Sequence, residues 1–209
     1  MLLRKPKAPA LPYAPPVYLP SHQDALASML RTYFNQLDTA TTALLGVNGG
    51  QHLSVPHGAF SSRVAQTTTA NTPTIVTFSQ TDYASGLSYV SGDGVHVSQN
   101  GVYNYQFSLQ LANTDTQIHE VTVWLRKNGT DFPYSASSYA VTASHGGIPG
   151  YLIAVCNFFI DLNAGDSIEL VWAATSSLVT IHYAGPSTSP FAHPGIPSAV
   201  ATLSFVSST

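Results

Sequence analysis

Charged side chains are scarce in this chain of 209 residues. Asp, Glu, Lys and Arg together make up 8% of it, against about 25% in a typical soluble domain. Seven residues are Lys or Arg, and the formal net charge is −3. A chain with so few cations lacks the basic surface that holds nucleic-acid phosphates, so we expect no nucleic-acid partner.

Long apolar runs are lacking as well. The longest is Tyr151–Cys156, far short of the ~20 residues that a membrane-spanning helix needs. The first residues are basic, but prolines at positions 6, 9, 12, 15, 16 and 20 interrupt any signal-peptide core. We therefore expect no membrane partner.

Cysteine is almost absent. The single Cys156 permits no disulfide within the chain, and its apolar surroundings favour a buried hydrophobe over a reactive thiol. Eight histidines are present, but none forms an H-x-H or H-E-x-x-H grouping, and one cysteine cannot complete a zinc site. The G-x-S-x-G elbow of hydrolases is also missing. We expect no metal, no cofactor and no enzymatic activity.

Proline dominates what is present at the start of the chain. The six prolines in residues 1–20 favour extended backbone and exclude helix. Apolar side chains lie between them, whereas a bare linker is normally rich in Gly, Ser or charge. We interpret this segment as an arm that docks in a groove of another protein, with an idle tail as the alternative. Its candidate docking residues are Leu11, Tyr13, Val17 and Tyr18.

Residues 21–45 have apolar side chains at helical spacing and predict an amphipathic helix. Ser21 and Asp24 resemble a capping box, and Gly46 is a candidate C-cap. Alternating steps of four and three residues also fit a coiled-coil seam. A pairing of the helix with its own copies and a pairing with another protein are both open. The residues on this stripe are Leu26, Leu30, Tyr33, Leu37, Ala40 and Leu44.

The pattern changes after Pro56, where apolar and polar residues begin to alternate. We expect a linker over 46–59 and an all-β domain over 60–209. Short strands separated by turn residues predict an antiparallel sandwich or barrel. The expected strands lie near 60–66, 73–79, 87–91, 94–98, 101–112, 118–127, 133–142, 150–162, 166–174, 178–184 and 198–206.

The clearest strand is GVYNYQFSLQL, in which apolar and polar side chains alternate. Such alternation is typical of an antiparallel strand with one core face. The dipeptides Asp93-Gly94, Asn100-Gly101 and Asn128-Gly129 predict hairpin turns.

The strand YLIAVCNFFI differs because it is apolar on both faces. A two-layer antiparallel sandwich has one interior, so the second face needs a cover. The residues that follow predict no helix to supply it, and leaving several large side chains exposed would forgo several kcal/mol, at about 25 cal/mol per Å². We expect a subunit interface. Its candidate residues are Tyr151, Ile153, Val155 and Phe159.

Three segments resemble the C1q/TNF-like trimeric jelly roll. VHVSQNGVYNYQFSLQL is similar to that family's strand, glycine turn and aromatic strand. FIDLNAGDSIELVW resembles its penultimate hairpin, with Gly165-Asp166 as the turn, and ATLSFVS resembles its closing strand. The resemblance implies an antiparallel jelly-roll sandwich that forms a homotrimer, with residues 151–159 near the threefold axis.

The upstream segments HQDALASMLRTYFNQLD, LLGVNGG and VPHGAFSS resemble short structural proteins of tailed bacteriophages. That resemblance implies a virion component, assembled in the host cytoplasm, that is a fibre, an appendage or a head-neck decoration. Its partners would be its own copies and a portal, adaptor, tail or capsid protein, reached through the arm and helix.

A receptor- or glycan-binding knob is the alternative function. Expected loops of the β domain contain aromatic, Ser, Thr and Asn side chains, which are the groups that bind neutral sugars. Packing beneath long loops would explain the same aromatic residues without a ligand. The candidate ligand residues are Tyr83, Tyr134, Tyr139, His145 and Phe191.

Overall fold

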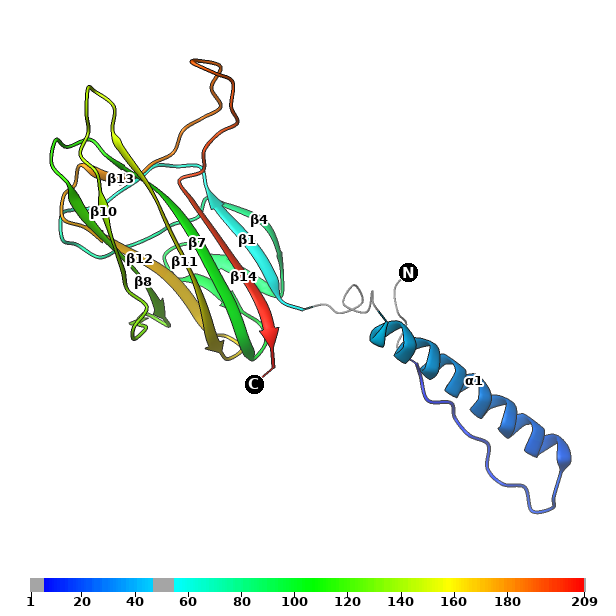
Figure 1. Ribbon diagram of the computed structural model, residues 1–209. Coiled ribbons are helices and arrows are strands. Elements are labelled where there is room, and N and C mark those ends of the chain that lie inside the picture. Colours follow the sequence, from blue (N-terminus) through cyan, green and yellow to red (C-terminus); the bar gives the residue numbers. More distant parts are fainter. Residues whose placement is uncertain (1–5, 47–54, 209) are drawn as a thin grey trace. The chain divides into compact units, whose positions relative to one another are not determined.

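The computed structural model describes residues 6–46 and 55–208. The chain divides into two compact units, Met1–Ser54 and Val55–Thr209, coloured blue and cyan to red in Figure 1. The division falls inside the linker predicted from the sequence. Residues 1–5 of the predicted arm and 47–54 of the predicted linker lie outside the described residues.

The first unit contains one helix, α1 (Pro20–Leu45), as the apolar spacing predicted. The predicted capping box is wrong. Leu19 is the N-cap and makes no side-chain cap hydrogen bond. The reason is that Pro20 starts the helix: proline suits the first turn, where its missing N–H costs no intrahelical bond, and Ser21 therefore lies inside the helix. Gly46 is the C-cap, in an extended conformation.

The second unit is an antiparallel β-sandwich, coarsely as predicted. Its strands in chain order are β1 (His57–Ser62), β2 (Gln66–Thr67), β3 (Thr74–Ile75), β4 (Gln80–Ser85), β5 (Leu87–Val90), β6 (Gly94–Val97), β7 (Gly101–Asn113), β8 (His119–Lys127), β9 (Thr130–Asp131), β10 (Ser137–Val141), β11 (Gly150–Leu162), β12 (Ser167–Ala174), β13 (Val179–Ile181) and β14 (Ala199–Ser207).

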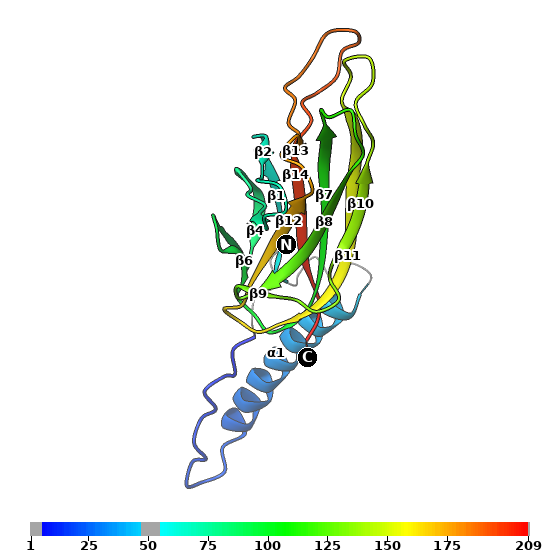
Figure 2. The same ribbon diagram turned by 90° about the vertical axis from the view of Figure 1, so that its left-hand side faces the viewer.

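These strands form two sheets, which Figures 1 and 2 show from two sides. The first sheet has the order β2-β13-β7-β14-β1-β4, and β11 pairs with β7 over its whole length. A strand has two edges, so β13 and β14 follow one another along the other edge of β7. The second sheet has the order β10-β8-β12-β6-β5, with β3 on β12 and β9 on β8.

One hydrophobic core lies between the sheets. The predicted inward row of β7, from Tyr103 to Leu111, is buried. Opposite it lie the buried rows of β8 and β12, which include Leu125, Leu170 and Trp172. Period-two alternation therefore identified the core faces of β7 and β8 correctly, because each of these two strands has one face in the interior. Strand β12 differs, since Glu169 and Val171 on its other face are buried as well.

Two expectations about strands were wrong. Strand β4 was not expected, and its Tyr83 was assigned to a loop. Strand β4 reads QTDYAS and is almost entirely exposed, because it lies at the edge of its sheet and needs no apolar face. The strand expected over 73–79 is reduced to β3 (Thr74–Ile75).

The turn predictions divide into two groups. Asn128 and Gly129 have φ of 50° and 75° and form the expected two-residue turn between β8 and β9. The β5–β6 hairpin also closes next to Gly94. By contrast, Asn100-Gly101 and Gly165-Asp166 connect strands of different sheets, so neither closes a hairpin. Both are sharp reversals, and turn chemistry does not reveal which sheet the next strand joins.

The two ends of the sandwich differ. The chain enters β1 at one end, and the connections 142–149 and 182–198 project beyond the other end (Figures 1 and 2). The second connection carries two isolated antiparallel bridges, Ala184 with Ile196 and Ser187 with His193. We call the end with these connections the loop end.

Candidate functional site: the outer face of strand β11

Strand β11 has two apolar faces, as its sequence predicted. The even-numbered side chains point into the core, where Ala154 and Ile160 are buried. The odd-numbered side chains point away from the core and are not covered by the chain itself. They are Tyr151, Ile153, Val155 and Phe159, with exposed fractions of 55%, 56%, 57% and 66%.

Strands β7 and β14 continue this outer face beside β11. Val155 lies opposite Ser108 of β7, which in turn lies opposite Val200 of β14. In the next row, Asn157 accepts a hydrogen bond of 2.7 Å at its Oδ1 from the Nδ2 of Asn104. A shallow groove of about 530 Å³ follows these rows. Its lining residues on the outer face are Gln106, Ser108, Val155, Asn157, Val200 and Thr202.

This face is almost free of charge. Strands β7, β11 and β14, all of them fully described, contain Asp161 as their single Asp, Glu, Lys or Arg. Asp161 lies near the end of β11, beyond Phe159. A solvent-facing sheet surface normally carries charged side chains, and charged residues are depleted at the centres of protein interfaces. The outer face of β11, β7 and β14 therefore has the composition of an interface.

The free edge of β11 is closed at one point by Tyr139. Its hydroxyl donates a 2.9 Å hydrogen bond to the carbonyl of Val155. Burial raises the pKa of this hydroxyl above 10, and the nearby Cys156 raises it further. Tyr139 was expected within the strand near 133–142 and also among the ligand residues of loops; it lies in β10 (Ser137–Val141), which confirms the strand and contradicts the loop. Its hydroxyl joins β10 to β11 and is therefore already used within the sandwich.

The predicted attachment residues lie in the first unit. Leu11, Tyr13, Val17 and Tyr18 of the arm are exposed, Tyr13 at 98%. The arm contacts the helix: the Tyr13 carbonyl is 3.0 Å from the Nε2 of His22, and Lys7 and Pro9 line a groove against the helix. On α1, Leu26, Leu30 and Tyr33 are half-buried and Leu37 is 40% exposed. The helix residues in that groove are Ser28, Met29, Thr32, Tyr33 and Gln36.

The five predicted ligand residues do not form one site. Tyr83 lies in strand β4, which forms the edge of the sheet opposite to β11, and Tyr139 lies in β10. Tyr134 is fully exposed in the connection between β9 and β10, with φ of 60°. His145 and Phe191 lie in the two projecting connections of the loop end. Aromatic side chains in turn-like sequence therefore did not identify a common surface.

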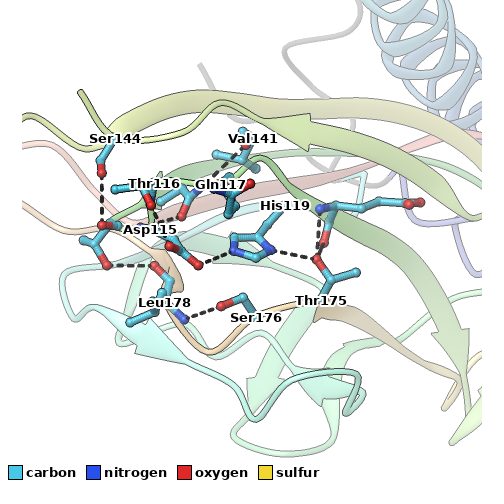
Figure 3. A network of polar contacts seen from close by, with 12 residues as sticks. Asp115, Thr116, Gln117, His119, Val141, Ser144, Thr175, Ser176 and Leu178 are labelled. Atoms are coloured by element: carbon cyan, nitrogen blue, oxygen red, sulfur yellow. Dashed lines mark hydrogen bonds and ion pairs between the residues drawn. The ribbon is translucent and has the colours of Figure 1, made fainter.

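A hydrogen-bonded network at the loop end centres on His119 (Figure 3). Its Nε2 is 2.7 Å from Oδ2 of Asp115, and its Nδ1 is 3.2 Å from Oγ1 of Thr175. The bond from His119, together with the Thr116 amide, holds the pKa of Asp115 below its ordinary value. Carboxylate, imidazole and hydroxyl follow one another here as they do in hydrolase triads.

The backbone contacts of Thr175 assign this network a structural role. Oγ1 of Thr175 accepts a 3.1 Å hydrogen bond from the amide of Glu120, and the Thr175 amide donates to the Glu120 carbonyl at 3.0 Å. These bonds extend the pairing of β8 and β12. The buried Asn113 continues the network, since its Nδ2 donates to the carbonyls of Gln117 and Thr142. The network therefore ties neighbouring connections together.

A second polar cluster, which was not predicted from the sequence, lies at the end of β8 away from the loop end. Lys127 Nζ is 2.8 Å from Oδ2 of Asp166, and Asn128 donates to Oδ1 of the same carboxylate at 2.7 Å. Burial raises the pKa of Asp166, but the hydrogen bonds from Lys127, Asn128 and the Asn163 amide outweigh it and lower the pKa to about 2. Charge spacing along the sequence gave no signal, because residues 127 and 166 meet only through strand pairing.

The described residues form neither a metal site nor a membrane-spanning helix. Within residues 6–46 and 55–208, no three His, Cys, Asp or Glu side chains gather closely enough to hold a metal ion. Over the same residues, no helix is long and apolar enough to cross a membrane. No protein-family model matches the chain, and no curated protein matches it significantly.

Proposed function

We propose that this chain is a homotrimeric structural protein, and that it is anchored to a larger assembly by its arm and helix. The expected assembly is the virion of a tailed bacteriophage, where the chain would be a fibre, appendage or head-neck decoration. That part of the proposal rests on the resemblance of residues 22–38, 44–50 and 55–62 to short phage structural proteins.

The observation that carries the trimer is the outer face of β11. Four large apolar side chains are more than half exposed on a sheet surface with one charged residue. Fully burying one such side chain contributes about 1.5–3 kcal/mol. Association itself costs roughly 4–15 kcal/mol. The four side chains of each copy are 55–66% exposed, so covering the exposed part contributes roughly 3–8 kcal/mol per copy. This is comparable with the cost of association, whereas an isolated copy would expose an aggregation-prone face.

We infer further that the sandwich is a jelly roll of the C1q/TNF type. Eight principal strands form two four-stranded layers, in the orders β1-β14-β7-β11 and β6-β12-β8-β10. Two such layers with repeated crossings are the arrangement of a jelly roll. The crossings from β6 to β7, β7 to β8, β10 to β11 and β11 to β12 support this assignment. In that family the corresponding face of β11 lies near the threefold axis.

The attachment role is supported by the composition of the first unit. A proline-rich arm and a helix without a single buried residue expose apolar side chains such as Tyr13 and Val17. Extended proline segments lose little conformational entropy on docking and commonly bind grooves of other proteins. Neighbouring virion proteins are the partners proposed for this segment.

The solution mass of the purified protein tests the trimer. The full chain is expected to have three times its 22.1 kDa mass. Val155→Asp places a charge in the middle of the proposed interface and is expected to give single chains that keep a folded sandwich. Ser88→Asp is the matched control, at an exposed position of β5 in the other sheet, and is expected to stay trimeric. A single-chain mass for the unmodified protein would overturn the trimer.

Particle incorporation tests the virion role separately. Deletion of residues 1–45 is expected to leave a trimer in solution that is missing from purified particles. Particles that take up the deleted chain would contradict attachment through the arm and helix. Particles that lack the full-length chain would contradict the virion assignment itself.

A further inference from the structure

Helix α1 presents a self-complementary surface. Leu30, Leu37 and Leu44 are seven residues apart and form one row. A second row with the same spacing lies beside it, at steps of three and four residues. It consists of Leu26, Tyr33 and Ala40. All of these residues are described, and not one of them is buried. Leu37 and Leu44 are exposed and the other four are half-buried, so both rows keep apolar surface that a partner can cover.

The charges of α1 lie on the opposite side. Asp24, Arg31 and Asp38 are its three charged residues, and they too are seven apart. At 100° per residue, this row lies roughly opposite the two apolar rows. In a coiled coil the leucine rows would be the a and d positions, and the charges would all fall at b, facing solvent.

The positions that flank the two rows carry no charge. On one side they are Ala27, Phe34 and Thr41, and on the other Met29, Gln36 and Ala43. Two-stranded coiled coils normally have charged residues at these e and g positions. A wide uncharged face is instead suited to contact with more than one neighbouring helix. Phe34, at 57% exposure, is uncovered on the side away from the arm.

The arm lies along one flank of this surface and reaches the second row at Tyr33. Lys7 and Pro9 line the same groove as Met29 and Gln36 of that flank, while Leu37 and Leu44 remain 40% and 42% exposed. The arm therefore does not complete the burial of the leucine row.

From this placement we propose that α1 forms a parallel three-helix coiled coil with α1 of two further copies of the chain. The proposal rests on the proposed homotrimer and adds a second self-association site to it. The eleven residues between Leu45 and His57 span at most about 40 Å. Three helices tethered in this way to one trimer have a local concentration on the order of millimolar. All three are tethered at their C-terminal ends, which selects the parallel arrangement.

Cysteine cross-linking of the full chain tests this proposal. In a Cys156→Ser background, Leu37→Cys places a thiol in the leucine row, and Asp38→Cys places one in the charged row next to it. After mild oxidation, disulfide dimers of the Leu37→Cys chain are expected to contain roughly two thirds of the protein, because one disulfide joins two of three copies. The Asp38→Cys control is expected to remain single chains on a denaturing gel.

The outcomes separate the helix from the sandwich. A trimeric mass without preferential cross-linking at position 37 would overturn the coiled coil and leave the trimer of the sandwich standing. Equal cross-linking at positions 37 and 38 would also overturn it, since random collision does not distinguish the two rows. A single-chain mass of the unmodified protein would overturn the proposed homotrimer first.

Discussion

The two units of this protein are stabilised in different ways. The sandwich encloses a continuous core in which Phe60, Leu109 and Trp172 are completely buried. Helix α1 has 26 residues and none of them is buried. Helices gain most of their stability from packing of an apolar face, and isolated ones are marginal in water. The sandwich can therefore fold on its own contacts, whereas α1 depends on partners.

The same contrast recurs within one strand. Ile160 and Phe159 are neighbours in β11, but Ile160 is 1% exposed and Phe159 is 66% exposed. The inward side chain contributes to the fold of one copy. The outward side chain contributes to stability only after another copy covers it. In β11, therefore, the inward-facing residues stabilise the fold of one copy, and the outward-facing residues that alternate with them stabilise the assembly.

The largest expected effect is a loss of stability of the sandwich when a residue of its core is truncated. Trp172→Ala removes a buried indole from the centre of the core and is expected to lower the free energy of unfolding by about 3–5 kcal/mol. Leu37→Ala in α1 should leave the unfolding transition of the sandwich where it is. Denaturant titrations followed by tryptophan or tyrosine fluorescence measure both. Equal shifts for the two variants would show that the units do not differ as described.

The next prediction separates the two faces of β11. Ile160→Ala is expected to cost about 2–5 kcal/mol of unfolding free energy, with the trimer retained under native conditions. Phe159→Asp is expected to weaken the trimer and to change the stability of the separated chain little. Sedimentation velocity and denaturant titration of each variant give the two readouts. If Phe159→Asp destabilised the single chain as much as Ile160→Ala, the outward face would belong to the core.

The same comparison explains how far the sequence could be read. Alternation identified β7 and β8 because each has one buried face, and the absence of a polar face singled out β11. Edge strand β4 was not predicted because almost all of its side chains face solvent, so its sequence does not alternate between apolar and polar residues. Tyr83, which lies in β4, was assigned to a loop for the same reason. Short strands in Ser- and Thr-rich sequence do not differ from turns until their pairing partners are known.

Side-chain contacts between residues far apart in the sequence could not be predicted, for a different reason. Lys127 meets Asp166, and His119 meets Thr175, only because β8 and β12 pair in one register. Nothing in the local sequence fixes that register. The sequence therefore predicted faces of strands well and polar networks not at all.

A smaller effect is expected at the free edge of β11. Tyr139→Phe removes the hydroxyl that donates to the Val155 carbonyl and should lower the free energy of unfolding by about 0.5–1.5 kcal/mol. Tyr83→Phe, on exposed β4, is the matched control and should have little effect. Thermal melting compares the two. A larger loss for Tyr83→Phe would argue against the role given to Tyr139.

The smallest effect is a pH dependence at the end of β8. The pKa of Asp166 is about 2 in the folded chain, against an ordinary value of 3.8. Its ionised form therefore stabilises the fold above about pH 4, and this contribution is lost as the pH falls from about 4 towards 2. The unfolding midpoint of the unmodified protein should drop more over this interval than that of Asp166→Asn. Identical drops would show that Asp166 does not contribute.

The mass of the purified full chain, measured by sedimentation equilibrium at micromolar concentration, tests the central claim most directly. The uncovered face of β11 predicts a single species of three times 22.1 kDa. A stable, soluble species of one chain mass would contradict it, since Tyr151, Ile153, Val155 and Phe159 would then tolerate solvent without a partner.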